Sequence, residues 1–496
     1  MSTIDVTRWS KRNLWPLASG DLAVRPGIRR LLAPDNGRKL VGGFSVKNGY
    51  TDETWHYVFD VATTGVKDLR MRIYDEEFQI FQALTFGDDV DPRAITHAVV
   101  HDEILICSPD FASRWGLVGS GVILAETVAS DSGSTALDVP RGICVAIGNR
   151  AVVFDGRTMY ASDPVSIEGG TIRSFIAENA NQRPGVVYGA HEGAGGSLVC
   201  VTSAGVYGLS AEAFAVGVVG SNGTSWDMLN HHRAYSYESS CAVRGRVWAL
   251  SQDGVMLVDT ENDASLPLDE SIMTRGIGGA RIFSEDWRAA RMYAGDSGPM
   301  VAYDARDALH MLDLNSKIAS WWTSAYAASN FKVRGVLEDG DGDRLLICEN
   351  GVFAVDGDFD GNAALTVVGD PVGVFAGRLV GSPAQNRDVM SVEVMAARGG
   401  GSTSELKVAV RGKVYSEQPI VDPEGFQIGT TDWASTEQRL TSTPLAAVQF
   451  KIGKEAARPT REPTIEVGVT GALARVGVSI EVKESGSAPE RPQKVG

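Results

Sequence analysis

Residues 151–161 read Ala151-Val-Val-Phe-Asp155-Gly156-Arg-Thr158-Met-Tyr-Ala161, two short apolar runs that flank an Asp-Gly pair. An Asp-Gly or Asn-Gly pair between apolar runs favours a tight β-hairpin, because a type I′ turn needs positive φ at both central residues. The same pattern recurs at Ala204-Gly205, Asp253-Gly254 and Asn350-Gly351. The stretch therefore predicts a hairpin that the chain repeats.

The hairpins recur at a nearly constant spacing. Weaker versions lie near Asp110 and Asp307, and a further hairpin surrounds Gly65. The turns at residues 65, 110, 156, 205, 254, 307 and 351 are 44 to 53 residues apart. A period of roughly 40–50 residues built from strand hairpins is typical of β-propellers, whose blades are four-stranded sheets. We expect an all-β fold with six propeller blades, or seven if the hairpin around Gly65 belongs to the ring.

The period ends near residue 361, and the pattern then changes to longer strands. Apolar and polar residues alternate over 388–396, 405–412, 446–452, 465–469 and 476–482, as in an antiparallel sheet with one buried face. The sequence therefore predicts four regions: a basic N-terminal arm with the first strands (1–48), a β-propeller (49–360), an antiparallel β-sandwich-like domain (361–483) and a disordered polar tail (484–496).

Composition and charge limit the class of protein. The chain has 496 residues, 43% hydrophobic and 22% charged, which suits a folded core and excludes disorder of the whole chain. The formal charge is −16, but residues 1–40 carry +5, which leaves −21 for residues 41–496. An acidic chain lacks the basic footprint of unspecific nucleic-acid binding. The basic arm is either a solvated segment or a contact for an acidic partner surface.

The five cysteines show no metal-binding spacing. They are an odd number without a Cys-x-x-Cys pair, so we expect reduced, buried thiols and a reducing compartment. The first 20 residues lack the apolar core of a signal peptide. The longest mostly apolar stretch, residues 116–129, is too short to span a bilayer and contains Glu126. We expect no insertion into a membrane.

Motifs for metal binding or catalysis are weak. The stretch Asp356-Gly-Asp358-Phe-Asp360-Gly361 resembles a calcium loop, but Val367 stands where an EF-hand has its twelfth-position Glu. We interpret it as an acidic turn. His231 and His232 are adjacent and match no ligand or nucleophile motif, and Walker A, GxSxG and HExxH sequences are absent. We therefore expect no catalytic residues, no metal, no cofactor and no enzyme activity.

Two other function classes remain open. Propellers also host glycosidases and lyases, which need paired carboxylates or a His base at the mouth of the central channel. An anionic substrate would add a cluster of Arg residues there. The alternatives are therefore an enzyme acting on polysaccharide, and a propeller that serves as an interaction scaffold or binds carbohydrate.

The order of features along the chain resembles the tail nozzle proteins of short-tailed phages, also called tail tubular protein B or phage stabilisation protein. The following segments carry the resemblance: Gly20–Leu31 with Arg25-Pro26-Gly27, Tyr57–Phe59, Ile104–Ile106, Asn149–Pro164, Val199–Leu209 and Ser320-Trp321-Trp322.

This resemblance implies a structural virion protein of the tail, assembled in the host cytoplasm. It implies a homo-hexamer beneath the portal, bound to the tail adaptor ring, with tail fibres or spikes as further partners. Genome DNA would pass through the lumen without specific binding, which suits an acidic chain because many Lys and Arg contacts to phosphate would hold DNA.

Overall fold

In the computed structural model of the chain, short antiparallel sheets follow one another along the sequence. The structure describes residues 10–16, 22–119, 122–124, 141–156, 158–162, 175–177, 185–211, 226–251, 254–258, 287–303, 308–313, 318–322, 332–356, 360–361, 367–369, 372–378, 386–398, 404–411, 438–440, 446–451, 464–470 and 473–485.

The first four blades are consecutive four-stranded sheets whose strands pair in sequence order. They consist of β5 (Arg38–Lys47), β6 (Thr54–Ala62), β7 (Leu69–Tyr74) and β8 (Ile80–Gly87); β9 (Thr96–Val100), β10 (Glu103–Cys107), β11 (Arg114–Leu117) and β12 (Val122–Leu124); β13 (Ile143–Ile147), β14 (Arg150–Asp155), β15 (Thr158–Ser162) and β16 (Phe175–Ala177); and β17 (Val187–Glu192), β18 (Leu198–Thr202), β19 (Val206–Leu209) and β20 (Asp227–Asn230).

Three further sheets continue the series, and the last of them includes a strand from the N-terminal part of the chain. Their strands are β21 (Ser240–Val243), β22 (Arg246–Ser251) and β23 (Gly254–Leu257); β24 (Arg291–Ala294), β25 (Pro299–Tyr303), β26 (Ala308–Asp313) and β27 (Ile318–Trp322); and β28 (Val333–Glu338), β29 (Arg344–Cys348) and β30 (Gly351–Ala354). In the seventh blade β4 (Arg29–Leu32) pairs antiparallel with β30, with Leu32 opposite Val352. The strand beside β30 thus comes from more than 300 residues earlier in the chain.

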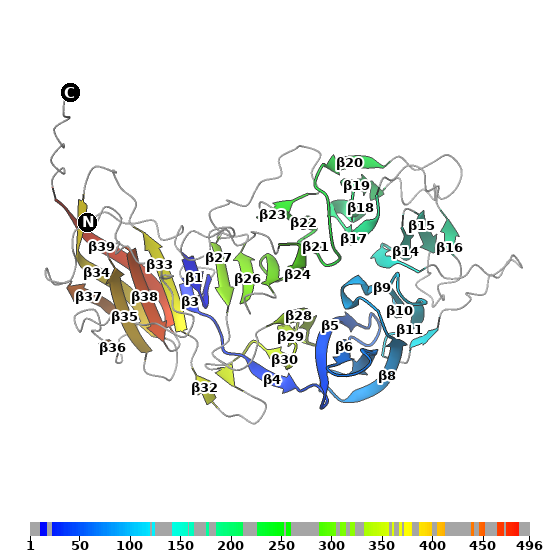
Figure 1. The fold of residues 1–496 in the computed structure, drawn as a ribbon, viewed down its shortest axis with the longest axis horizontal. Helices are drawn as coiled ribbons and strands as arrows, with labels where there is room; N and C mark the ends of the chain where they lie inside the picture. Colours follow the sequence, from blue (N-terminus) through cyan, green and yellow to red (C-terminus); the bar gives the residue numbers. More distant parts are fainter. Residues whose placement is uncertain are drawn as a thin grey trace, which may run out of the picture.

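The seven blades form a closed ring (Figure 1). Among the described residues, buried apolar clusters fill the interface between each blade and the next. At the closing interface, Leu40 and Tyr74 of the first blade pack with Leu345 and Ile347 of the seventh. First strands of neighbouring blades contact one another along most of the ring, so they are the innermost strands. The hairpin around Gly65 joins β6 to β7 and completes the seven-bladed ring.

The hairpin repeat found in the sequence is the connection between the second and third strand of each blade. The register differs from the expected turn at three of the pairs: Asp155 is paired with Thr158, Ser251 with Gly254 and Cys348 with Gly351. At the last of these, Glu349 and Asn350 are the two turn residues and Gly351 begins β30. A Cβ at Gly351 would lie 2.5 Å from the carbonyl oxygen of Leu32. This glycine therefore allows β4 to approach the seventh blade.

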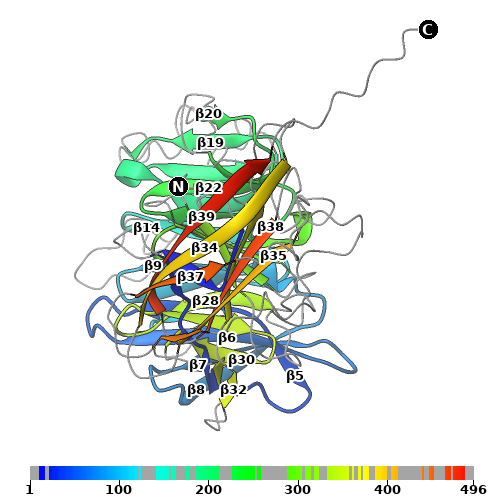
Figure 2. The same ribbon diagram turned by 90° about the vertical axis from the view of Figure 1, so that its left-hand side faces the viewer.

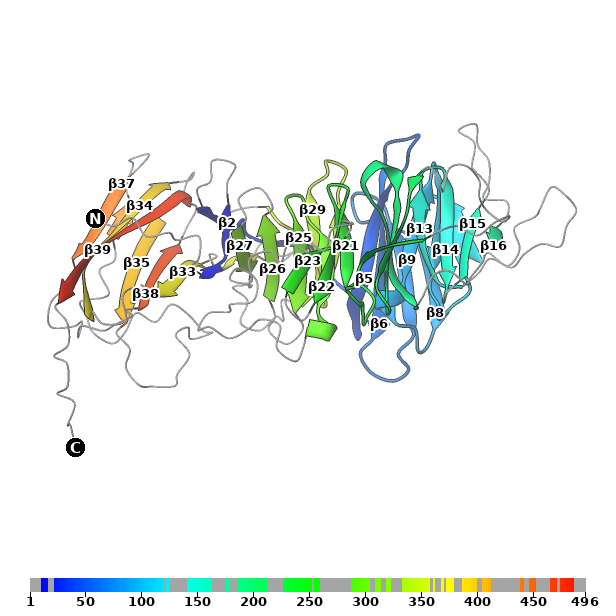
Figure 3. The same ribbon diagram turned by 90° about the horizontal axis from the view of Figure 1, so that it is seen from above.

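The C-terminal strands form two further sheets that lie face to face beside the ring (Figures 2 and 3). One contains β33 (Val372–Arg378), β38 (Thr464–Thr470), β35 (Ser404–Arg411) and β36 (Gln438–Leu440), and the other contains β39 (Leu473–Ser485), β34 (Asn386–Arg398) and β37 (Ala446–Lys451); β31 (Asp360–Gly361) and β32 (Val367–Gly369) extend the seventh blade. The consecutive strands β34 and β35 belong to opposite sheets. This arrangement is the expected β-sandwich-like unit.

The N-terminal strands connect the ring to these sheets. β1 (Ser10–Arg12) pairs with β27 of the sixth blade on one side and with β33 on the other. The hairpin of β2 (Leu14–Pro16) and β3 (Leu22–Val24) joins β39. Strands β1 to β4 therefore contact both parts of the molecule before the first blade begins.

Several smaller expectations can be compared with the described residues. All five cysteines are free and buried, as expected. Trp322 is 4% exposed in the cluster between the sixth and seventh blades. Of the predicted disordered tail, Glu484 and Ser485 belong to β39, and residues 486–496 lie outside the described residues. No helix in the described part of the chain is long and apolar enough to cross a membrane.

Candidate functional site

Charged side chains from several blades meet where the innermost strands begin, at the face of the ring that we call the start face. Arg291 is the first residue of β24, and Glu238 lies two residues before β21. Nη1 of Arg291 donates to the carbonyl oxygen of Val41 in β5 at 3.2 Å. The same Nη1 lies 3.2 Å from Oε2 of Glu238. One guanidinium group therefore connects the first, fifth and sixth blades.

A second, tighter ion pair lies within the seventh blade, next to the first blade. Arg334, in β28, donates to Oε1 of Glu349 from Nη2 at 2.5 Å and from Nε at 3.2 Å. Nζ of Lys39 in β5 reaches the same oxygen at 3.2 Å. The backbone N–H of Leu40 donates to the carbonyl oxygen of Glu349. The turn that follows β29 is thereby held against the innermost strand of the first blade.

The short 3-10 helix η2 (Pro92–Ala94) contributes the third charged pair. Asp91 accepts the backbone N–H of Arg93 at 3.0 Å and so caps this helix. Arg93 also donates to both carboxylate oxygens of Asp91, at 3.1 and 3.0 Å. We call the whole group the axial cluster, and its members are Lys39, Asp91, Arg93, Glu238, Arg291, Arg334 and Glu349.

The two glutamates of the axial cluster have opposite pKa shifts. Burial raises the pKa of Glu238 to about 7, against the opposing charges of Arg291, Arg93 and Arg334, and Asp91 adds to the rise. Burial acts in the same direction on Glu349, but hydrogen bonds and charge from Arg334 and Lys39 hold its pKa below the ordinary value. Carboxyl groups whose environments push their pKa values apart are characteristic of acid–base and binding sites.

Glu238 also has an unusual backbone. Its φ is 55°, in the left-handed region that a residue with a Cβ rarely adopts. Its carbonyl oxygen accepts the N–H of Met292 at 2.7 Å, which fixes this conformation against β24. Its side chain is 23% exposed, but the carboxylate oxygen Oε2 that faces Arg291 is buried. A residue held in this way points to a role beyond packing.

The arrangement allows two kinds of chemistry. Guanidinium groups bind carboxylates and other oxyanions through paired, charge-assisted hydrogen bonds. A carboxyl group that titrates near neutral pH can accept or release a proton at little cost. Both kinds of group lie together in the axial cluster, next to the hydroxyl of Tyr293, whose pKa burial raises well above its ordinary value.

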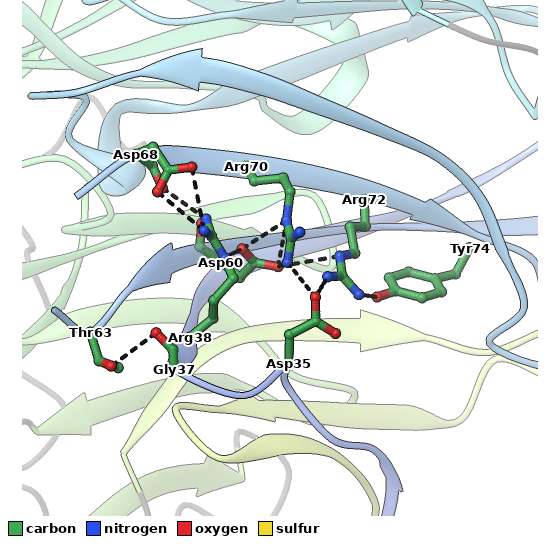
Figure 4. Close-up of polar contacts among 9 residues, drawn as sticks. All are labelled: Asp35, Gly37, Arg38, Asp60, Thr63, Asp68, Arg70, Arg72 and Tyr74. Atoms are coloured by element: carbon green, nitrogen blue, oxygen red, sulfur yellow. Dashed lines mark hydrogen bonds and ion pairs between the residues drawn. The ribbon is translucent and has the colours of Figure 1, made fainter. Parts of the chain in front are cut away.

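A second charged network lies in the first blade and the connection that precedes it (Figure 4). The Asp60 side chain is 4% exposed and pairs with Arg38, Arg70 and Arg72. Asp35, in the connection from β4 to β5, pairs with Arg70 at 2.8 Å and with Arg72. Charges of both signs are closely paired here. The ion pairs of Asp35 hold the connection between β4 and β5 against the first blade.

A cavity of about 240 Å³ lies at the opposite face, between the sixth and seventh blades. Met300, Met311 and Trp322 contribute apolar walls, and the turns after β24 and β28 supply carboxylates at the rim. Arg344 pairs there with Asp296 at 2.6 Å and with Glu338 at 3.2 Å. The cavity is thus remote from the axial cluster.

The residues considered from the sequence are not those of the axial cluster. Asp356 pairs with Arg29 at 2.6 Å, and Asp358 lies outside the described residues. His231 is exposed, and burial lowers the pKa of His232 to about 4. Within the described residues, no group of three or more His, Cys, Asp or Glu side chains could hold a metal ion.

Sequence reasoning missed the axial cluster because its members are far apart in the chain and belong to no motif. Glu238 follows the run His231-His232-Arg-Ala-Tyr, with no feature that marks its left-handed backbone. Their position within the blade repeat could have indicated them, because Arg291 and Arg334 lie at the start of the first strand of their blades. Aligning the blades by their hairpins would have placed both near the axis.

Comparisons with known proteins give distant likenesses. No protein-family model matches the chain, and no curated protein matches it. Among solved structures, the chain is similar to the extracellular domain of a putative one-component system from B. thetaiotaomicron, with 10% identity and a TM-score of 0.41 over 91% of this chain and 60% of that one. It thus spans less than two thirds of that domain.

Two further structures are similar at the same level. Virginiamycin B lyase from Staphylococcus aureus has 9% identity and a TM-score of 0.40, over 66% of this chain and 97% of the lyase. PorZ, a surface component of the type-IX secretion system of Porphyromonas gingivalis, has 13% identity and a TM-score of 0.36, over 73% of this chain and 44% of PorZ.

These findings correct the assignment made from the order of sequence features. The similar structures are bacterial proteins of other kinds, and none of the three is a phage tail protein. The predicted membership of the phage tail nozzle family is therefore wrong. The motifs behind it are short: the described part of the stretch Asn149–Pro164 consists of strands β14 and β15 of the third blade. The hexamer, the adaptor ring, the fibre or spike contacts, the passage of DNA and the virion location rested on that resemblance, and nothing in the structure tests them.

Proposed function

We propose that this β-propeller protein is a recognition module that binds its ligand on the start face, at the axial cluster. The observation that supports the proposal is the convergence of Glu238, Arg291 and Arg334 from three different blades on one place near the axis. Sequence-distant polar groups that converge at the mouth of a ring are the usual basis of a ligand site.

The surrounding fold suits a binding role. The ring is rigid because each blade is packed on both sides by its neighbours, so the side chains at its mouth are held in place without a ligand. Preorganised groups lose little conformational entropy when a ligand binds. This reading corresponds to the interaction scaffold or carbohydrate-binding propeller that the sequence left open.

A second candidate is an enzyme acting on an acidic polysaccharide. The specific observation in its favour is Glu238, whose pKa burial raises to about 7, beside the guanidinium group of Arg291. In such an enzyme Arg291 would neutralise a sugar carboxylate and Glu238 would accept a proton. Binding without turnover would exclude this candidate and leave the recognition module.

An array of neutral, amino and uronate oligosaccharides tests both candidates at once, with binding read by fluorescence and turnover by product analysis. Arg93→Met is the informative variant. The Arg93 side chain is 32% exposed and forms an ion pair with Asp91, a near neighbour in the chain, so its loss should leave the contacts between blades intact. Arg344→Met on the opposite face is the matched control. We expect wild type and Arg344→Met to bind the same ligands and Arg93→Met to lose them. Equal binding by all three proteins would contradict an axial site.

A further inference from the structure

The two arginine–glutamate pairs of the axial cluster are not equivalent. Arg334 donates two hydrogen bonds to Glu349, and Lys39 adds a third. Oε2 of Glu238 lies within ion-pair distance of Arg291 but accepts no hydrogen bond from the described part of the chain. The Glu238–Arg291 pair is therefore the one that an incoming anion can replace at lower cost.

The charges that face Glu238 are mostly positive. They come from β24 (Arg291, with the neutral Tyr293), from η2 and its cap (Arg93 and Asp91) and from β28 (Arg334). Burial opposes the charge on Asp91, but Arg93 holds its pKa below the ordinary value, so Asp91 is ionised at neutral pH. When Glu238 takes up a proton, Lys39 and the three guanidinium groups of the axial cluster remain, with two carboxylates, Asp91 and Glu349, to balance them. This local excess of positive charge stands out in a chain of net charge −16.

The access to this position also favours a small anionic group. The side chain of Arg93 is 32% exposed and that of Glu238 is 23% exposed, whereas those of Arg291 and Arg334 are 10% and 8% exposed. A ligand would therefore meet Arg93 and Glu238 first and reach Arg291 by taking the place of the Glu238 carboxylate. A carboxylate has the size and the two oxygens that such a replacement needs.

We infer that the ligand of the axial cluster presents a carboxylate, which pairs with Arg291 and Arg93 in place of Glu238 while Glu238 takes up one proton from solvent. This inference rests on the proposed binding function and adds the chemical class of the ligand. No covalent bond changes: the ligand carboxylate stays ionised, and the proton ends on the displaced Glu238 carboxyl group.

Proton uptake on binding makes the affinity depend on pH in a defined direction. Glu238 titrates near pH 7, so its protonated fraction rises about tenfold from pH 8 to pH 6. The association constant for a carboxylate should rise by about the same factor over this range. Glu238→Gln mimics the protonated form and should bind at pH 8 as tightly as wild type does at pH 6.

Isothermal titration calorimetry with galacturonate trimer, citrate and inorganic sulfate, against neutral galactose trimer, tests this inference. Titrations at pH 8 in two buffers of different ionisation enthalpy count the protons taken up. We expect nearly one proton for wild type, none for Glu238→Gln, and weaker binding for Arg291→Met and Arg93→Met. Arg344→Met serves as the folded control, and near-ultraviolet circular dichroism checks each variant.

The outcomes separate this inference from the proposed function. Binding of the neutral trimer that Arg93→Met abolishes, without a preference for carboxylates, would overturn the inference and keep the axial site. Sulfate bound as tightly as both carboxylates would overturn the stated ligand class. Carboxylate binding that is independent of pH and of Glu238 would overturn the exchange. No binding of any probe at millimolar concentration would also overturn the inference, and the oligosaccharide array would then decide the proposed function.

Discussion

Burial raises the pKa of some side chains of this protein and lowers the pKa of others. It raises the pKa of Glu238 to about 7 and lowers the pKa of His56 to about 4. In both groups burial disfavours the charged form, which is the carboxylate for Glu and the imidazolium for His. The two residues differ in what surrounds them: Glu238 faces several arginines at the mouth of the ring, whereas His56 is fully buried in β6.

The contacts of His56 explain why it stays neutral. The Ser45 hydroxyl accepts the N–H of Glu338 at 2.9 Å and also forms a hydrogen bond of 2.9 Å with Nδ1 of His56. Nε2 of His56 is buried and has no hydrogen-bond partner among the described residues. The ring stacks on Phe78, with 4.7 Å between the ring centroids. An added proton would place a charge in this apolar contact.

We predict that stability falls as the pH is lowered from about 6.5 to 4. The folded pKa of His56 lies below its unfolded value, so protons favour the unfolded chain, and the stabilisation present above pH 6.5 is lost as the pH falls towards 4. His97, His191 and His232, whose pKa values burial also lowers to about 4, act in the same direction. A fully buried histidine contributes about 3 kcal/mol to this loss at most.

Urea unfolding at pH 7.5, 6.0, 5.0 and 4.5 measures this dependence. In His56→Gln we expect lower stability at pH 7.5 but a smaller further loss in acid, because one proton-binding site is removed from the unfolded chain. The same loss between pH 7.5 and 4.5 in wild type and variant would contradict the role of His56.

Among the contacts between strands, the pairing of β4 with β30 completes the seventh blade. Gly351 has φ of 155°, and a Cβ there would lie 2.5 Å from the carbonyl oxygen of Leu32. Arg30 side-chain carbons lie just beyond, at 2.8 and 3.0 Å from the same position. The first residue of β30 must therefore lack a side chain for β4 to complete the seventh blade.

Gly351→Ala should weaken this pairing and lower the free energy of unfolding by about 1–3 kcal/mol through overpacking. The control is Gly65→Ala in the turn between β6 and β7, where φ is 77° and nothing lies within 4 Å of the added Cβ. That variant should lose only about 1 kcal/mol for the left-handed backbone. Thermal and urea unfolding of both variants provide the comparison, and a larger loss in Gly65→Ala would contradict the steric argument.

On the scale of the whole molecule, the N-terminal segment closes the ring and joins it to the C-terminal sheets. β1 and the β2–β3 hairpin pair with strands of the C-terminal sheets, and β4 pairs with the seventh blade. Several basic residues of the segment have partners within the chain: Arg29 pairs with Asp356, and Arg38 pairs with Asp60 and Asp68. The positive charge of residues 1–40 thus partly serves the fold.

Deletion of residues 1–34 should open the ring between the first and seventh blades. We expect loss of the cooperative thermal transition and rapid proteolysis, because the edge of β30 and the cluster around Leu345 and Ile347 become exposed. Deletion of residues 1–9, which keeps β1 to β4, is the matched control. Circular dichroism and limited trypsin digestion measure the effect. An unchanged melting temperature in the longer deletion would contradict closure by β4.

The sequence by itself determined the all-β class, the blade period and the buried, free cysteines, because hairpin turns and strand patterns depend on residues close together in the chain. Asp155-Gly156 predicts its turn without help from the rest of the molecule. Only the tertiary structure decided the closure of seven blades, since β4 pairs with a strand more than 300 residues away. The axial cluster has the same origin: Arg93, Glu238, Arg291 and Arg334 have no common motif, and their charges interact only because the ring brings the starts of the innermost strands together.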